Sequence, residues 1–225
     1  PQNQAWLSLL KEGECSDATY PSDPPLVLDK AAGDRVWDVE GRDYIDLCMG
    51  FGVQTFGHNP PHLRKLFAQM QEDPRFLTHG MGDVYASTAK VQLISELLAM
   101  MPAHLEQAGL ALTGGQAVEF AVKSALLRAG PDAAFICFEG GYHGLDLGIL
   151  PLTHRRDFSR GLDGGSSIPV IHLPYGCSEE ALESALEKLK SNGRRVAGVL
   201  VEPIQGRAGF RFAGLPWLKT CLLYT

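Results

Sequence analysis

The stretch AAFICFEGGYHG, residues 133–144, decides the fold of this chain. Its first half is a continuous apolar run that ends just before Gly140-Gly141, which predicts a buried strand. Upstream, residues 117–128 carry apolar side chains at helical spacing and are followed by Gly130-Pro131, which predicts a helix that ends there. A helix therefore leads directly into a buried strand.

The same alternation continues toward the C-terminus. Two more apolar runs, 168–173 and 196–201, predict strands. Between them, residues 179–190 predict a helix that Ser178 caps and whose first turn is acidic. Strands that alternate with helices indicate a mostly parallel sheet in an α/β fold.

The N-terminal part is organised differently. Residues ahead of Pro24 are polar and weakly patterned, which predicts an arm that is either mobile or packed on the rest. Within residues 36–47, two short alternating segments flank Glu40-Gly41 and predict a β-hairpin.

Two helices are expected between the hairpin and the α/β region. One begins at Pro61, and the other begins near Ser87 and carries an apolar stripe that we expect in the core. We therefore predict two regions. An arm and hairpin occupy residues 1–60, and an α/β domain occupies residues 61–225.

Composition narrows the class of function. The 225 residues carry a net charge of -6 from mixed acidic and basic residues, which argues against nucleic-acid and membrane partners. No apolar run is long enough to cross a bilayer. The five cysteines form no C-x-x-C pair, which favours free thiols in the cytoplasm over a disulfide framework or a metal site.

Three motifs could carry chemistry. Gly114-Gly115 precede a helix, so their backbone N–H groups and the hydroxyl of Thr113 could bind an anion such as phosphate. A plain glycine turn is the alternative. Tyr142 follows the end of a strand, where open α/β sheets bind ligands, and its ring could stack on a flat molecule; a loop tyrosine is the alternative.

His143 could orient a cofactor, and a structural loop histidine is the alternative. Glu202 ends the last predicted strand and would reach the same sheet edge as Tyr142, although a strand-terminal glutamate is commonly solvated or capping a helix. Gln205 and Arg207 would ordinarily be surface residues. The conjunction of motifs favours a pocket for a phosphorylated aromatic cofactor.

In this order the motifs TGGQAVE (113–119), FEGGYHG (138–144) and VEPIQGRAG (201–209) resemble the N-terminal half of a class III aminotransferase. The resemblance extends over residues 28–212. It implies a fold type I enzyme with a three-layer α/β/α sheet domain, dependent on pyridoxal 5′-phosphate, acting as a homodimer on an amino donor and a 2-oxo acid.

The resemblance also implies roles for individual residues. Gly114 and Gly115 would hold the cofactor phosphate, and Tyr142 would stack on the pyridine ring. Glu202 and Gln205 would line the site, and Phe51 would lie in the substrate cavity.

Four positions depart from the family pattern. Gly115 stands where Ser, Thr or Ala is usual, and Gln116 stands where Glu or Asp is usual. Leu145 stands where acetylornithine-type members carry a carboxylate-binding Arg, and Arg207 stands where ornithine and 4-aminobutyrate members carry a Glu. The substrate is therefore left open.

The resemblance implies a Schiff-base lysine that no lysine of this chain matches. We therefore expect this chain to be a fragment that is inactive alone. We assign no catalytic residue within it. Three alternatives remain open: an aminomutase similar to glutamate-1-semialdehyde aminomutase, a non-catalytic binding module, and a fragment that does not fold stably.

Overall fold

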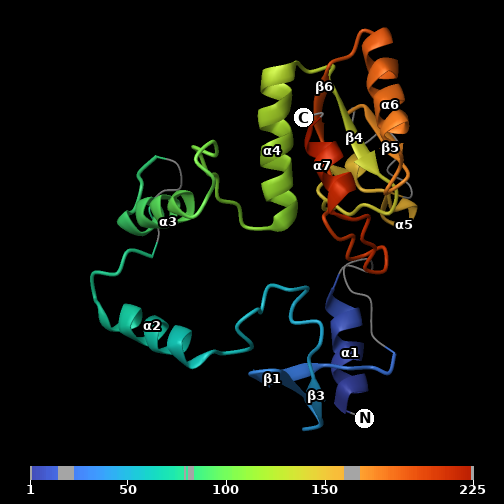
Figure 1. The fold of residues 1–225 in the computed structure, drawn as a ribbon. Helices are drawn as coiled ribbons and strands as arrows, with labels where there is room; N and C mark the ends of the chain where they lie inside the picture. Colours follow the sequence, from blue (N-terminus) through green and yellow to red (C-terminus); the bar gives the residue numbers. More distant parts are fainter. Residues whose placement is uncertain (1, 15–22, 79, 81–83, 160–167, 224–225) are drawn as a thin grey trace. The chain divides into compact units, whose positions relative to one another are not determined.

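The computed structural model describes residues 2–14, 23–78, 80, 84–159 and 168–223 (Figure 1). The chain divides into two compact units, Pro1–Ser87 and Thr88–Thr225. The boundary that we placed at residue 60 remains a prediction. No helix among the described residues is long and apolar enough to cross a membrane.

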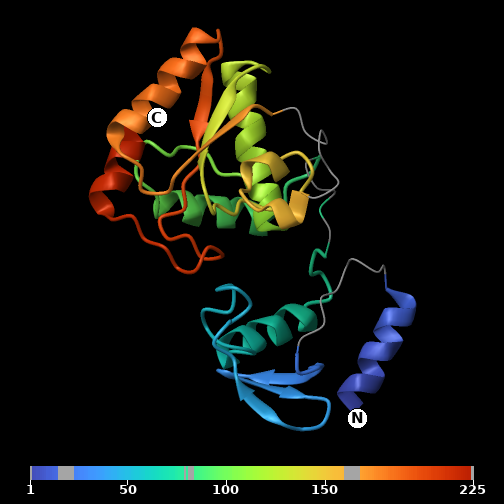
Figure 2. The same ribbon diagram turned by 90° about the vertical axis from the view of Figure 1, so that its right-hand side faces the viewer.

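The first unit contains a small antiparallel sheet with strands in the order β1-β2-β3 (Figure 2). The predicted hairpin is confirmed, because β2 and β3 pair around the turn that contains Gly41. The strand β1, which precedes the hairpin, was not predicted. The elements of this unit are α1 (Gln2–Gly13), β1 (Leu28–Ala32), β2 (Arg35–Asp38), β3 (Asp43–Ile45) and α2 (Pro61–Glu72).

The described part of the N-terminal arm is the helix α1, which is held to this sheet through Asp38; residues 15–22 of the arm lie outside the described residues. The Asp38 carboxylate is 1% exposed and accepts hydrogen bonds from Asn3 Nδ2 at 3.0 Å, Arg42 Nε at 2.8 Å and Tyr44 Oη at 3.1 Å. Burial by itself raises the pKa of Asp38, but the bonds from Asn3, Arg42 and Tyr44 lower that pKa well below its usual range. Helix α1 is therefore packed on the hairpin.

The second unit is built on a parallel sheet with strands in the order β5-β4-β6. All five residues of the central strand β4 are buried. The elements are α3 (Thr88–Ala99), α4 (Gly114–Ala129), β4 (Ala134–Phe138), η1 (Leu150–Leu152), α5 (Arg156–Ser159), β5 (Val170–Leu173), α6 (Glu179–Ser191), β6 (Val196–Val199) and α7 (Leu215–Leu223).

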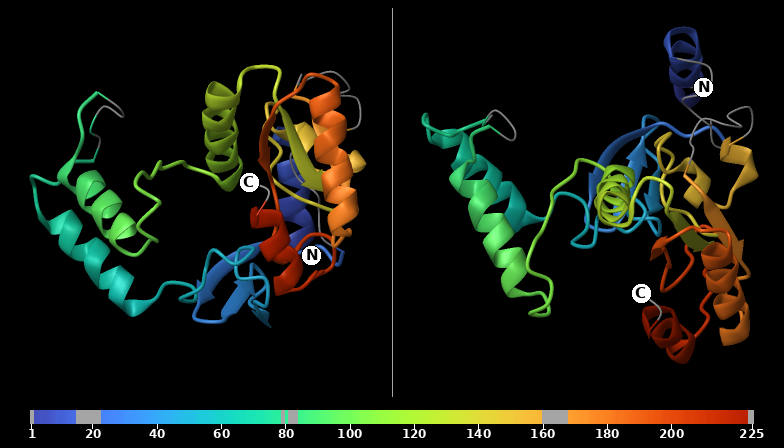
Figure 3. Two further views of the ribbon diagram at one scale, coloured as in Figure 1. Left: turned by 45° about the horizontal axis from the view of Figure 1, so that its top comes forward. Right: turned by 90° about the horizontal axis from the view of Figure 1, so that it is seen from above.

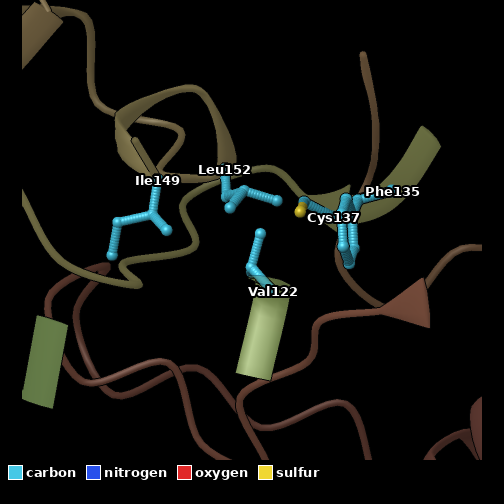
Figure 4. Close-up of a cluster of buried hydrophobic side chains, with 5 residues drawn as sticks. All are labelled: Val122, Phe135, Cys137, Ile149 and Leu152. Carbon is cyan, nitrogen blue, oxygen red and sulfur yellow. The ribbon is translucent and has the colours of Figure 1, made fainter. Parts of the chain in front are cut away.

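Helices α4 and α6 cover opposite faces of this sheet (Figures 1 and 3). On the α4 side, Val122 points toward Cys137 of β4 and Leu152 (Figure 4). On the α6 side, Leu182 and Leu189 pack with Ile136 of the same strand. Successive residues of β4 are all buried, but they face α4 and α6 alternately. This confirms the predicted three-layer α/β/α arrangement.

The apolar stripe of α3 was wrongly predicted to lie in the core. None of the residues of this helix is buried. Within the stripe, Val91 is 57% exposed, and Ile94, Leu97 and Leu98 are only partly buried. Helical spacing predicts that a stripe shares one face, but burial needs an element that packs on that face. The sequence pattern showed the stripe and not its partner.

Candidate functional site

The site lies at the C-terminal edge of the parallel sheet, where β4 and β6 both end. The loop after β4 turns at Gly140, whose φ is +81°, and then reaches Tyr142. Tyr142 N donates a hydrogen bond to Glu202 Oε1 at 2.8 Å, across 60 residues of sequence. Glu202 therefore ties the two strand ends together.

The backbone at Glu202 is held by Tyr175. Tyr175, which follows β5, donates from its hydroxyl to the backbone oxygens of Glu202 and Pro203, each at 3.0 Å. The loops after all three strands are thus linked at one edge.

The first turn of α4 faces the same edge. Thr113 caps the helix, because its Oγ1 accepts a hydrogen bond from Gln116 N at 3.1 Å. Among the described residues, neither Gly114 N nor Gly115 N has a hydrogen-bond acceptor. A helix N-terminus with two available N–H groups is suited to an anion.

The loop after β4 packs closely on this turn through glycines. A Cβ placed on Gly144 would lie 2.8 Å from Gly115 Cα, and a Cβ placed on Gly115 would overlap Asp146 Oδ2. A residue larger than glycine at position 115 would need the carboxylate of Asp146, the flexible end of a side chain, to move.

Together these residues line an open pocket of about 740 Å³. The structure brings six of the predicted site residues to it and adds four that the sequence did not single out as cofactor ligands. The predicted six are Thr113, Gly114, Gly115, Tyr142, His143 and Glu202; the additional four are Val118, Gly144, Leu145 and Asp146.

Gln205 is placed differently from the expectation. It is 1% exposed and does not line this pocket; its Nε2 donates to Glu139 O at 2.9 Å. Its Oε1 is buried and has no hydrogen-bond partner among the described residues. Gln205 therefore supports the loop that carries Tyr142.

Phe51 belongs to the first unit, which is described separately from the pocket. Its side chain is 84% exposed, and its backbone has a φ of +58°, which is uncommon outside glycine. Its place in a substrate cavity remains a prediction.

His143 lies in the pocket wall as a neutral side chain at neutral pH. Burial, together with the nearby His172, lowers the pKa of His143 to about 4. Its backbone N donates to Thr153 Oγ1 at 2.9 Å, and that hydroxyl donates to Gly144 O at 2.9 Å. Thr153 thus holds the turn, a role that only tertiary contacts reveal.

Arg207 also belongs to the surroundings of Tyr142. Its guanidinium carbon lies 4.8 Å from the centre of the Tyr142 ring. In the sequence, this arginine was noted only as a departure from the family pattern. Its contact with the Tyr142 ring could not be predicted, because no local pattern shows which ring an arginine covers.

The chemistry of the pocket fits a phosphorylated aromatic ring. The α4 N-terminus offers N–H donors for a phosphate, and Tyr142 offers an aromatic face. The carboxylate of Glu202 offers an acceptor for a ring N–H or hydroxyl. Pyridoxal 5′-phosphate combines these features in one molecule.

Comparison with known proteins supports a family assignment. The family model described as aminotransferase class-III matches residues 18–222. A diaminobutyrate–2-oxoglutarate transaminase of Halomonas elongata is 33% identical over 226 residues, which cover 94% of this chain and 52% of the relative. A 5-aminovalerate aminotransferase of Pseudomonas aeruginosa is 34% identical over 196 residues, which cover 83% of this chain and 45% of the relative.

Solved structures show the same fold. The ornithine aminotransferase of Toxoplasma gondii superposes with a TM-score of 0.82 at 23% identity, over 98% of this chain and 50% of that chain. An omega-transaminase of Thermomicrobium roseum gives 0.79 at 22% identity, over 98% of this chain and 54% of that chain. The predicted fold type I is confirmed.

This chain spans about half the length of the curated relatives that it matches. The family model nevertheless extends from residue 18 to residue 222 and includes all three motifs at the sheet edge. The chain therefore belongs to the class III aminotransferase family.

Proposed function

We propose that the protein containing this chain transfers an amino group between an amino donor and a 2-oxo acid, with pyridoxal 5′-phosphate as cofactor. The observation that carries the proposal is the pocket in which the α4 N-terminus, Tyr142 and Glu202 converge. Family membership supports the same activity. The relatives named above are transaminases of diaminobutyrate and 5-aminovalerate.

The residues of this chain have distinct parts in that proposal. Gly114 N and Gly115 N bind the phosphate, and the hydroxyl of Thr113 has a hydrogen left to donate to it, because its oxygen accepts from Gln116 N. Tyr142 orients the pyridine ring by stacking. Glu202 holds the Tyr142 loop at the strand ends, and neutral His143 adds no charge to the wall.

Pyridoxal 5′-phosphate, when bound, supplies an electron-withdrawing ring and an aldehyde that can carry the amino group. The part of the chain's residues is to fix the position of this cofactor at the edge of the sheet. We further propose a cytoplasmic homodimer. The free cysteines among the described residues support the location, since unpaired thiols are usual in reducing compartments.

The test is an amino-transfer assay on the complete protein that contains these residues. With an amine donor and 2-oxoglutarate present, we expect glutamate to form, and we expect no product when the oxo acid is omitted. Product formation without an added acceptor would instead indicate an aminomutase. No product with any donor tried, from a protein that binds the cofactor, would contradict the proposal.

A Tyr142→Ala variant links the assay to the pocket. We expect the cofactor to bind about tenfold more weakly, because a stacked aromatic pair and its buried area are lost. Tyr142→Phe keeps the ring and is the matched control. Equal losses in both variants would show that the hydroxyl, not the ring, is what matters.

A further inference from the structure

One guanidinium covers two aromatic rings beside the pocket. The Arg207 guanidinium carbon lies 4.8 Å from the centre of the Tyr142 ring and 5.4 Å from that of Phe158. The two rings meet edge to face, with centres 6.1 Å apart and planes at 64°. Cations over aromatic faces at these distances are attracted by the ring quadrupole.

These contacts bear directly on the orientation of the Tyr142 ring. The backbone of Tyr142 is fixed by its bond to Glu202, but its hydroxyl has no hydrogen-bond partner among the described residues. Two side-chain torsions of Tyr142 must therefore be set by packing. Phe158 meets the ring edge to face, and Arg207 covers one of its faces.

An aromatic ring has two faces, and a stacked ligand needs only one. We propose that Arg207 is a positioning residue: it covers one face of Tyr142 and, with Phe158, holds the other face ready for a flat, phosphorylated ring in the pocket. This inference rests on the proposed function. It gives a role to Arg207, which stands where, by the resemblance, ornithine and 4-aminobutyrate aminotransferases carry a glutamate.

Charge around the pocket is consistent with this role. The pocket lining contains the carboxylates of Asp146 and Glu202 and no lysine or arginine. A phosphate adds further negative charge. A guanidinium stacked on Tyr142 offsets part of that charge without itself binding the phosphate.

The chain provides a matched control for this arginine. Arg211 lies four residues further along the same segment, and its guanidinium covers the Tyr175 ring at 5.5 Å, outside the pocket lining. Arg207→Gln and Arg211→Gln therefore remove the same charge from neighbouring positions. Arg207→Lys keeps the charge and loses the planar guanidinium.

The experiment measures the affinity of the chain and its variants for pyridoxal 5′-phosphate, pyridoxal and inorganic phosphate. It also measures near-ultraviolet circular dichroism of tyrosine in the absence of ligand. Far-ultraviolet circular dichroism and thermal melts establish that each variant is folded.

For Arg207→Gln we expect about two- to fivefold weaker binding of pyridoxal 5′-phosphate and a reduced tyrosine signal. Inorganic phosphate senses only the lost charge and does not stack on Tyr142, so its affinity should fall by less than that of pyridoxal 5′-phosphate, each compared with Arg211→Gln. Arg207→Lys should recover part of the affinity. Equal affinity and equal tyrosine signal in Arg207→Gln and Arg211→Gln would overturn the inference.

Tighter binding by Arg207→Gln would also overturn it, because the guanidinium would then occupy the face that the ligand needs. A wild-type chain that binds pyridoxal 5′-phosphate no better than pyridoxal would instead contradict the proposed phosphate pocket, and the positioning role would fall with it. The two failures are therefore distinguishable.

Discussion

Gly144 is the residue at which the loop after β4 comes against α4. Its φ is +123°, and a Cβ there would lie 2.8 Å from both Gly115 Cα and Ile149 Cδ1. We expect Gly144→Ala to lower the free energy of unfolding of the second unit by about 1–3 kcal/mol, because a backbone atom must move.

Gly114→Ala is the control, since a Cβ there would meet nothing within 4 Å. Urea denaturation of both variants checks the prediction. Similar stabilities for the two would show that the loop does not approach the helix as closely as described.

His143 links stability to pH through a buried, neutral imidazole. Burial and His172 lower its pKa from 6.5 to about 4, so between these values the unfolded chain binds more protons than the folded chain. Above pH 6.5, His143 is neutral in both the folded and the unfolded chain, and the free energy of unfolding is at its full value with respect to this residue. As the pH falls from 6.5 toward 4, the free energy of unfolding decreases. The loss is on the order of 3 kcal/mol.

We expect His143→Gln, which cannot titrate, to lose less stability than the wild type between about pH 7 and about pH 5. Urea denaturation at both pH values measures the difference. His154 and His172 are kept in both proteins, because the His172 ring lies 4.9 Å from the His154 ring and its pKa is lowered as well. Parallel pH profiles would contradict the assignment.

At the scale of elements, the packing of α4 on β4 holds the site in place. Leu152 of η1 is fully buried between these elements with Val122 and Cys137 (Figure 4). Leu152→Ala removes the same atoms as Leu127→Ala, but Leu127 on α4 is 90% exposed.

We expect Leu152→Ala to cost about 2–5 kcal/mol and Leu127→Ala to stay within about 0.5 kcal/mol of the wild type. Thermal and urea denaturation compare them. A cost for Leu127→Ala as large as for Leu152→Ala would show that the second unit packs differently.

The sequence predicted the elements that have strong local signals. The apolar run of β4, the Ser178 cap of α6 and the glycines at the two ends of α4 are local signals, and each of these elements formed; α4 begins at Gly114, earlier than the predicted start at residue 117. Helix α1 was missed, because its anchor is one amide, Asn3, that binds a carboxylate 35 residues away. No local pattern encodes such a pair.

At the scale of the whole molecule, the order of the strands predicts which site residues come together at the sheet edge, but it does not predict which side chains meet across the loops. The roles of the site residues remain predictions. The topology of a parallel sheet brings Tyr142 and Glu202 to one edge, so their proximity followed from the order of strands. Loop conformation decides that Arg207 contacts the Tyr142 ring and that Gln205 binds Glu139 O and does not line the pocket. The spacing of residues in the sequence predicts neither contact.

The central claim is that the α4 N-terminus and Tyr142 form a pocket for a phosphorylated aromatic ring. The most direct test is calorimetric titration of the chain with pyridoxal 5′-phosphate and, separately, with pyridoxal, which lacks only the phosphate. We predict that the phosphorylated form binds at least about tenfold more tightly, because only it reaches the free N–H groups of Gly114 and Gly115. Equal affinity for the two compounds would contradict the claim.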